Sequence, residues 1–165
     1  MRKIGICGGS SRMGARLIEE IRKIEPKTWI AVYDLKYPPG PINERPGDEY
    51  SIFDLTNTSD YYAYFHWQKF AAIFQIASPP QESTELQRIV QTLKMTMSIL
   101  EAAKGCKHVA IFQPNGTSNL AQIVDDLAKA YGKHVMTWAP FYGESLDQLI
   151  VHMAKTALDA THTIA

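Results

Sequence analysis

Short apolar runs alternate with amphipathic helical patterns along almost the whole chain, and this alternation restricts the fold more than any other feature. The runs with the length and residue content of strands are "KIGICGG", "TWIAVYDL", "EYSIFDL", "FAAIFQIAS", "KHVAIFQ" and "HVMTWAP". Helical patterns extend to about residue 24 and then cover residues 59–69, 82–104, 120–132 and 144 onward. Repeated βα units predict an α/β fold, with three layers and a doubly wound, mostly parallel sheet of about six strands.

Length and composition point to a single domain without an evident nucleic-acid or membrane partner. A chain of 165 residues with 45% hydrophobic residues fits one domain over residues 1–165. Lys+Arg and Asp+Glu both number 17, so no basic face or acidic tail is indicated. The N-terminus lacks the features of a signal peptide, and Cys7 and Cys106 form neither a disulfide framework nor a metal-ligand spacing. We expect a cytoplasmic protein with no metal site.

The stretch "KIGICGGSSRMG" leads from the first strand through a glycine turn into the first helix. Glycine lets the backbone approach a pyrophosphate closely, and the helix N-terminus supplies N–H groups to the phosphates. Where the usual pattern has its middle glycine stands Ser11 or Arg12, depending on register. The alternative is a turn that binds nothing. The turn predicts a Rossmann-like dinucleotide site, with cofactor contacts from Gly8, Gly9, Ser10, Ser11, Arg12, Met13 and Gly14.

Asp34 closes the second strand 20 residues after Gly14, where a carboxylate accepts hydrogen bonds from ribose hydroxyls. This favours NAD, whereas Arg12 and Lys36 favour the 2′-phosphate of NADP. Both cofactors stay open, with NAD slightly favoured. The fourth strand run ends at the same sheet edge in residues that we assign to the cofactor site, namely Ala77, Ser78 and Pro79. The alternative for residues 77–79 is that they only form the exit of the strand. The proline-rich segment 36–49 is a loop that either folds over a ligand or has no part in binding.

Several segments resemble prephenate and arogenate dehydrogenases, the NAD(P)-dependent enzymes of tyrosine synthesis. "IGICGGSSRMG" resembles their opening, "QIASPPQESTELQRIVQTL" their strand, proline turn and helix, and "LAQIVDDLAKAYGKHVMTWAP" their later helix and strand. In "QLIVHMAKTALDAT", Gln148 and His152 fall on matching positions, which makes His152 a candidate catalytic residue. The resemblance implies the cofactor domain of an oxidoreductase. It also implies departures: Gln113 before Pro114 stands where that family has its histidine, and the helical dimerisation domain has no counterpart.

A second set of segments is similar to extended short-chain dehydrogenases and nucleotide-sugar epimerases. "SILEAAKGCKHVAIF" resembles their helix and strand, and "FDLTNTSD" resembles their aspartate-containing turn near the adenine. "YGESLDQLI" resembles their Tyr-x-x-x-Lys segment, so Tyr142 is the second candidate catalytic residue, as proton donor. Leu146 stands at the lysine position, and Thr117, next to Gly116, is the stand-in for their serine.

The sequence therefore leaves three functions open. The first is an NAD(P)-dependent dehydrogenase acting on a small-molecule substrate, either on the prephenate dehydrogenase pattern or as a degenerate short-chain dehydrogenase. The second is a catalytically silent sensor or subunit that binds the nucleotide and reports it to a partner. The third is a structural α/β module. The aromatic segment "DYYAYFHW" favours core or an oligomer interface, so a homo-oligomer or a partner subunit also stays open.

Overall fold

The fold is a parallel sheet covered by helices on both faces. We describe residues 1–57, 69–113, 118–132, 134–139 and 145–162 of a computed structural model, which contain the six strands of one sheet. The strands are β1 (Lys3–Cys7), β2 (Trp29–Asp34), β3 (Glu49–Ile52), β4 (Ala72–Gln75), β5 (His108–Phe112) and β6 (Val135–Trp138). They lie in the order β3-β2-β1-β4-β5-β6, and every neighbouring pair is parallel. The α/β, doubly wound prediction is thus confirmed, and the order is that of the Rossmann fold.

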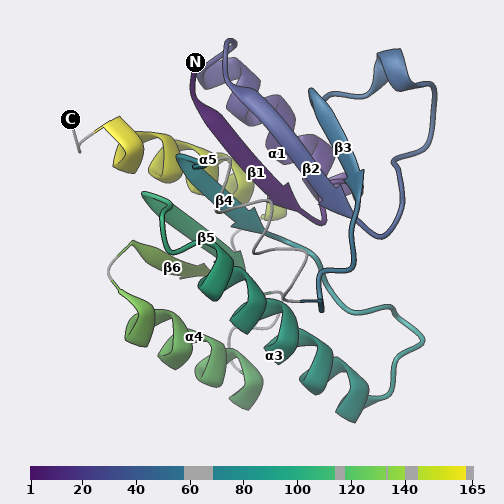
Figure 1. The fold of residues 1–165 in the computed structure, drawn as a ribbon, viewed down its shortest axis with the longest axis vertical. Coiled ribbons are helices and arrows are strands. Elements are labelled where there is room, and N and C mark those ends of the chain that lie inside the picture. The colour runs from purple at the N-terminus through teal and green to yellow at the C-terminus, as the bar shows by residue number, and fades with distance from the viewer. Residues whose placement is uncertain (58–68, 114–117, 133, 140–144, 163–165) are drawn as a thin grey trace.

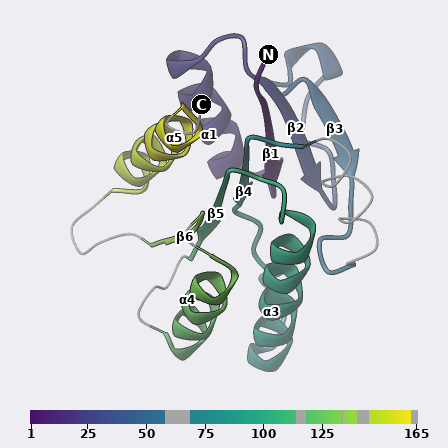
Figure 2. The same ribbon diagram turned by 60° about the vertical axis from the view of Figure 1, so that its left-hand side comes forward.

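Capped helices lie on the two faces of this sheet. They are α1 (Arg12–Ile24), α3 (Glu85–Ala102), α4 (Asn119–Tyr131) and α5 (Leu146–His162). Figures 1 and 2 show α1 and α5 on one face and α3 and α4 on the other. The third helix begins later than the sequence predicts because Thr84 caps it, in a capping box with Gln87. The helix predicted over residues 59–69 lies outside the described part of the chain.

The sheet separates two hydrophobic cores. Alternate residues of each strand point to opposite faces, so Ile6 packs toward α1 and α5 while its neighbour Cys7 packs toward α3 and α4. On one face, α1 contributes Ile18; on the other, α3 contributes Ile99, and both side chains are fully buried. Strands buried on both faces explain why the sequence shows continuous apolar runs rather than alternation.

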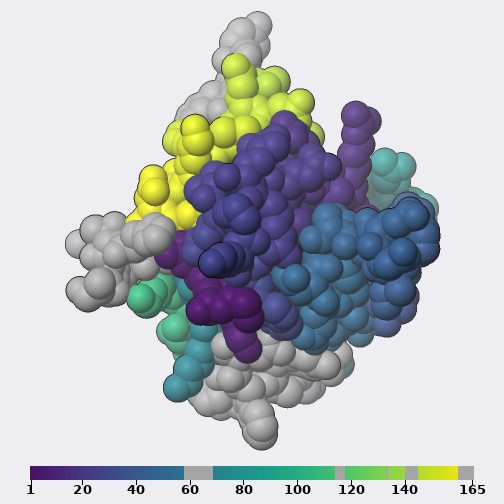
Figure 3. All heavy atoms as spheres, turned by 90° about the horizontal axis from the view of Figure 1, so that it is seen from above, coloured from purple at the N-terminus to yellow at the C-terminus, as the bar shows by residue number. Residues whose placement is uncertain are grey.

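Residues 35–48 connect β2 to β3 without an α-helix, containing only a 3-10 turn at Ile42–Glu44. Because β2 and β3 are parallel, this segment runs from the carboxyl edge of the sheet back to its amino edge. Asp48 holds its far end, accepting a hydrogen bond from the Ile30 N–H (2.7 Å) and pairing with Arg22 of α1. Figure 3 looks onto the amino edge and shows α1 between α5 and this loop. The proline-rich loop is therefore a crossover connection.

Candidate functional site

The candidate site lies at the carboxyl edge of the sheet, where the strand order reverses between β1 and β4. The connection after β1 leads to β2 on one side, and the chain later crosses to β4 on the other side. In open α/β sheets such a reversal leaves a crevice in which ligands bind. The glycine turn after β1, Asp34 at the end of β2 and Ala77 after β4 all lie at this edge.

The glycines of the first turn are required by the protein's own packing. Gly8 has φ +85°, and a Cβ there would lie 2.5 Å from the Ala77 Cα. A Cβ on Gly9 would lie 2.7 Å from Val32 Cγ1, and one on Gly14 would lie 2.5 Å from the Gly9 carbonyl carbon. The turn is thus pressed against the exit of β4 and against the start of α1, which is the geometry that brings a backbone close to a bound pyrophosphate.

Ser11 takes the place of the middle glycine. With Gly9 and Gly14 as the outer glycines of G-x-G-x-x-G, the middle position is residue 11, and there Ser11 caps α1. Its hydroxyl accepts a hydrogen bond from the Gly14 N–H (3.1 Å) and donates to the Gly8 carbonyl (2.9 Å). Its single proton is used inside the turn, so the phosphate contact predicted for this hydroxyl requires that bond to break. Among the described residues, the backbone N–H groups of Arg12 and Met13 have no hydrogen-bond acceptor and remain for an anion.

Asp34 links the end of β2 to the glycine turn. Its Oδ2 accepts a hydrogen bond from the Ser10 backbone N–H (3.0 Å), and its Oδ1 accepts one from the Leu35 N–H (2.8 Å). Each carboxylate oxygen has a further lone pair, so both can still accept a hydroxyl proton. The competing cations, Arg12 and Lys36, are exposed to solvent.

Asp34 also lines a pocket of about 250 Å³, here called the Asp34 pocket. Asp54 and Thr56, which follow β3, form another part of its wall, and Met95 of α3 closes it. The Thr56 hydroxyl (2.7 Å) and its backbone N–H (2.9 Å) both donate to Asp54 Oδ1, which holds the pKa of Asp54 below its ordinary value. The described residues that line the Asp34 pocket include two carboxylates, Asp34 and Asp54, and no cationic side chain.

A second pocket, of about 320 Å³, lies between α3 and α4 and is here called the Arg88 pocket. Phe112 and Leu120 give it apolar walls, and Arg88 and Thr92 reach it from α3. The two pockets share a wall formed by Ala77, Ser78 and Pro79. These residues, assigned to the cofactor site from sequence, therefore lie between two adjoining hollows at the strand-order reversal.

Gln113, which stands where the prephenate dehydrogenase pattern has a histidine, lines the Arg88 pocket. Its side chain is buried, and its Nε2 donates to the Ala121 carbonyl of α4 (2.9 Å). An amide has no basic nitrogen, so Gln113 cannot remove a proton. Its role here is to tie the end of β5 to the first turn of α4.

The structure does not bring His152, one of the two candidate catalytic residues, into these pockets. His152 is exposed on α5 and packs edge-on against Trp138, with ring centroids 5.1 Å apart. It lines a separate hollow of about 390 Å³ together with Gln148 and Lys155. Tyr142 lies outside the described residues, as does Thr117. In the sequence, α4 and β6 lie between β5 and Tyr142.

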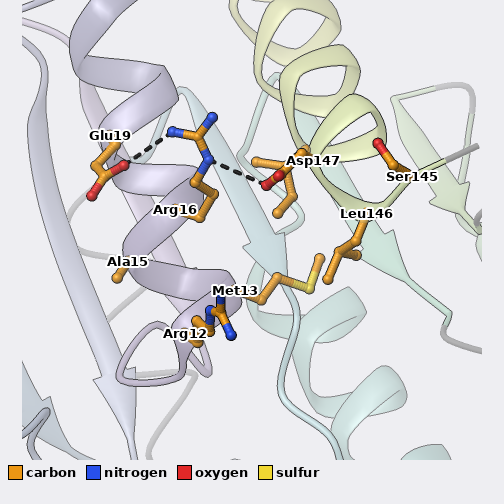
Figure 4. A pocket seen from close by; sticks show the side chains of 9 residues that line it. Arg12, Met13, Ala15, Arg16, Glu19, Ser145, Leu146 and Asp147 are labelled. Carbon is orange, nitrogen blue, oxygen red and sulfur yellow. Dashed lines mark hydrogen bonds and ion pairs between the residues drawn. The ribbon is translucent and has the colours of Figure 1, made fainter.

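A further hollow, of about 560 Å³, lies between the N-terminal ends of α1 and α5 (Figure 4). Arg16 lines this hollow and forms ion pairs with Glu19 (3.0 Å), Glu20 (2.9 Å) and Asp147 (3.3 Å). The protein's own carboxylates thus neutralise this guanidinium. We interpret the cluster as a clamp between α1 and α5, since Asp147 belongs to the first turn of α5.

The described residues offer neither a reactive thiol nor a metal site. Burial raises the pKa of Cys7 well above its usual value, with Asp34 and Cys106 acting in the same direction, and burial raises the pKa of Cys106 to about 12. No group of three or more potential metal ligands occurs in the part of the chain that the structure describes. Within the same residues, none of the helices has the length and apolar content needed to cross a membrane.

Sequence reasoning missed the contribution of α3. The residues of this helix that reach the two pockets are Arg88, Gln91, Thr92 and Met95. Their three- and four-residue spacing places them on one helical face, which is a signal that the sequence does contain. This spacing alone did not identify the residues as part of the site. The first turns of α3 extend past the edge of the sheet, and the packing of the helix determines which of its faces lies toward the site.

Comparisons with known proteins agree on the fold. No family model matches the chain, and no curated protein matches it in sequence. The UDP-glucose 4-epimerase of Brucella ovis, solved with NAD, has a TM-score of 0.69 at 13% identity over 86% of this chain. A Rossmann-fold NAD(P)-binding family protein of Shigella flexneri has a TM-score of 0.70 at 10% identity over 95%. The GalE-like L-threonine dehydrogenase of Cupriavidus necator has a TM-score of 0.65 at 13% identity over 85%.

These likenesses define the class of fold and leave the family open. The chain spans about half of the epimerase (52%) and of the threonine dehydrogenase (54%), but 86% of the Shigella protein. At identities of 10–13% the similarity shows a Rossmann fold alone. None of the structures named is a prephenate dehydrogenase, so the resemblance to that family gains no support from them.

Proposed function

We propose that the protein binds NAD(P) across the carboxyl edge of its sheet, with NAD as the preferred cofactor. The observation that carries the proposal is the position of Asp34. Its carboxylate is held by the glycine turn through the Ser10 N–H and at the same time lines the pocket that adjoins this turn. A dinucleotide needs these two features side by side, one for its pyrophosphate and one for its adenosine ribose.

In this proposal the adenosine half occupies the Asp34 pocket. Asp34 accepts hydrogen bonds from the ribose hydroxyls, and the adenine lies against Met95 and near Asp54. The pyrophosphate lies over the start of α1, where the backbone N–H groups of Arg12 and Met13 face it. The nicotinamide half then extends past Ala77 toward the Arg88 pocket.

NAD is preferred because a 2′-phosphate would meet the Asp34 carboxylate. The two negative groups would lie at hydrogen-bond distance, and the like-charge repulsion outweighs the attraction of Arg12 and Lys36, which are solvated. If NAD(P) binds, the cofactor supplies hydride transfer. The protein's residues bind and orient it.

Calorimetric titration with NAD and NADP tests the proposal. We expect saturable binding of NAD, weaker binding of NADP, and at least a tenfold loss of NAD affinity in Asp34→Ala with a shift of preference toward NADP. Asp126→Ala is the matched control because it removes an exposed carboxylate of α4 that lines neither pocket. Unaltered NAD binding by a folded Asp34→Ala variant, or no saturable binding at millimolar cofactor, would contradict the proposal.

A catalytically silent cofactor-binding sensor or subunit is the second candidate. Two observations favour it: Gln113 is tied to α4 in place of a base, and Leu146 stands where the short-chain dehydrogenase pattern has its lysine. Turnover of NAD with prephenate, arogenate and a panel of hydroxy acids separates it from the enzyme. NADH formation that His152→Ala or Tyr142→Phe abolishes would rule out the silent candidate.

A further inference from the structure

The two adjoining pockets differ in charge, and this contrast points to the kind of molecule that each accepts. The described lining of the Asp34 pocket has two carboxylates and no cation. That of the Arg88 pocket has one cation, Arg88, and no carboxylate. Among the described lining residues, they share the neutral segment 77–79. A ligand that spans the edge of the sheet therefore meets acceptors at one end and a guanidinium at the other.

We infer that the Arg88 pocket is the subsite for a second ligand, and that this ligand is a small carboxylate with an apolar body. The inference deepens the proposed function and rests on it in one respect, since it makes this ligand the substrate or effector that lies next to the nicotinamide. The pocket volume of about 320 Å³ is at the small end of ligand pockets.

The shape of the pocket fits this ligand class. Phe112 and Leu120 supply apolar surface on the side of β5 and α4, while Arg88 and Thr92 lie one helical turn apart on α3. Figures 1 and 2 show α3 and α4 side by side, with the N-terminal ends of both helices toward the carboxyl edge of the sheet. An apolar ring or chain can contact the walls while its carboxylate reaches the guanidinium.

Arg88 is held by a hydrogen bond to another residue that lines the pocket, Gln81. One of its terminal nitrogens, Nη2, donates to the Gln81 backbone carbonyl, which follows the proline turn after β4. A guanidinium has five donor N–H groups in a planar fork, so this bond leaves the others for a carboxylate. Anchoring at one nitrogen lowers the entropy that the side chain loses when it pairs with a ligand.

Benzoate and benzamide are the probes for this inference, because they share one shape and differ by a negative charge. Binding is followed by chemical-shift changes of the backbone amides on ¹⁵N-labelled protein, with and without saturating NAD. We expect benzoate to shift the amides of Ser78, Thr92 and Ser118, which line the pocket, and to bind at least about fivefold more tightly than benzamide.

Variants on α3 separate recognition by Arg88 from general attraction. Arg88→Gln is expected to lose the preference for benzoate and to keep its affinity for NAD. Arg88→Lys is expected to retain part of the preference for benzoate. Lys104→Gln is the matched control, since it removes one positive charge from just beyond the far end of the same helix and lines neither pocket. Equal binding of the two probes, or an unchanged benzoate preference in Arg88→Gln, overturns the inference.

The two titrations also separate this inference from the proposed function. Normal NAD binding without a charge-dependent probe site refutes the carboxylate subsite alone. A benzoate site that depends on Arg88 in protein unable to bind NAD supports the subsite and refutes the proposed cofactor. Loss of both would refute both.

Discussion

Gly14 packs its α-carbon against the backbone of Gly9 at the point where α1 begins. A methyl group there would lie 2.5 Å from the Gly9 carbonyl carbon, and a backbone cannot move aside as a flexible side chain can. We expect Gly14→Ala to lower the free energy of unfolding by about 2–3 kcal/mol, measured by urea denaturation. Gly105→Ala is the control, because a Cβ at Gly105 meets nothing within 4 Å, and this change should raise the free energy of unfolding by about 0.4–1 kcal/mol.

Equal stability of the two variants would show that the first turn is less tightly packed than described. The result also governs the interpretation of binding data. Loss of cofactor in a Gly14 variant is informative only if the variant folds, whereas Asp34→Ala removes side-chain acceptors without a steric clash.

His108 begins β5 with a buried imidazole whose Nε2 has no hydrogen-bond partner among the residues that the structure describes. Burial lowers its pKa to about 4, and the nearby His134 acts in the same direction. An unfolded chain takes up this proton near pH 6.5, so between about pH 6.5 and 4 the unfolded state binds more protons than the folded one. We therefore expect stability to fall as the pH is lowered through this window, by about 2–3 kcal/mol from this residue.

Comparison with His108→Gln isolates this contribution, because glutamine has no proton to gain. The pH dependence of urea denaturation should be shallower in the variant between pH 6.5 and 4, and carboxylates elsewhere contribute equally to both proteins. Parallel curves would mean that His108 is protonated in the folded protein. His152→Gln serves as a control at an exposed histidine.

At the scale of single elements, α3 depends on its capping box for its first turn, which also carries Arg88. The Thr84 hydroxyl accepts a hydrogen bond from the Gln87 N–H (3.2 Å), and the Gln87 side chain accepts one from the Thr84 N–H (2.8 Å). Thr84→Ala should lower the free energy of unfolding by about 1 kcal/mol, whereas Thr84→Ser keeps the hydroxyl and should lose less than half of that. Thermal or urea denaturation measures the free energy of unfolding of both variants. Equal losses of stability in Thr84→Ala and Thr84→Ser would exclude the helix cap as the cause.

The elements themselves were predictable to a large extent. All six strands occur where apolar runs predict them, and the four central strands, β1, β2, β4 and β5, are apolar nearly throughout because both of their faces are buried. Ser118 caps α4, with its hydroxyl accepting a hydrogen bond from the Ala121 N–H. The crossover between β2 and β3 was not assigned its path, because a proline-rich segment has no periodicity that points to one edge of the sheet.

The candidate site was predictable only in part. The glycine turn, Asp34 and the segment 77–79 come together because parallel strands end at one edge, a rule that sequence order already contains. Arg88 and Met95 were missed, since their approach depends on how far α3 projects beyond that edge. His152 was placed near the ligand by resemblance alone, and the packing of α5 against Trp138 puts it elsewhere.

For the whole molecule, the two cores share the sheet but no helix. Ile18 and Ile99 are both fully buried, on opposite faces. Removing one methyl group from each, in Ile18→Val and Ile99→Val, should cost about 0.5–1.5 kcal/mol apiece, and the double variant should match the sum within about 0.5 kcal/mol. Ile123→Val, at a side chain 47% exposed on α4, should have little effect.

Urea denaturation followed by both fluorescence and circular dichroism measures these values. A single transition in every variant is expected because the strands between the cores belong to both. Two separate transitions would show that the faces unfold independently, and a clearly non-additive double variant would show that the sheet transmits strain between them.

The contact between the first strand region and the last helix determines when this fold becomes possible during synthesis. Arg2 donates to the Leu158 carbonyl (3.5 Å), and α5 supplies Leu149, Met153 and Leu158 to the core over β1. Until the ribosome has released residue 158, α1 alone covers this face of the central strand. Folding of this face is therefore a late event, and the nascent chain must hold an apolar surface that a chaperone would recognise until α5 arrives.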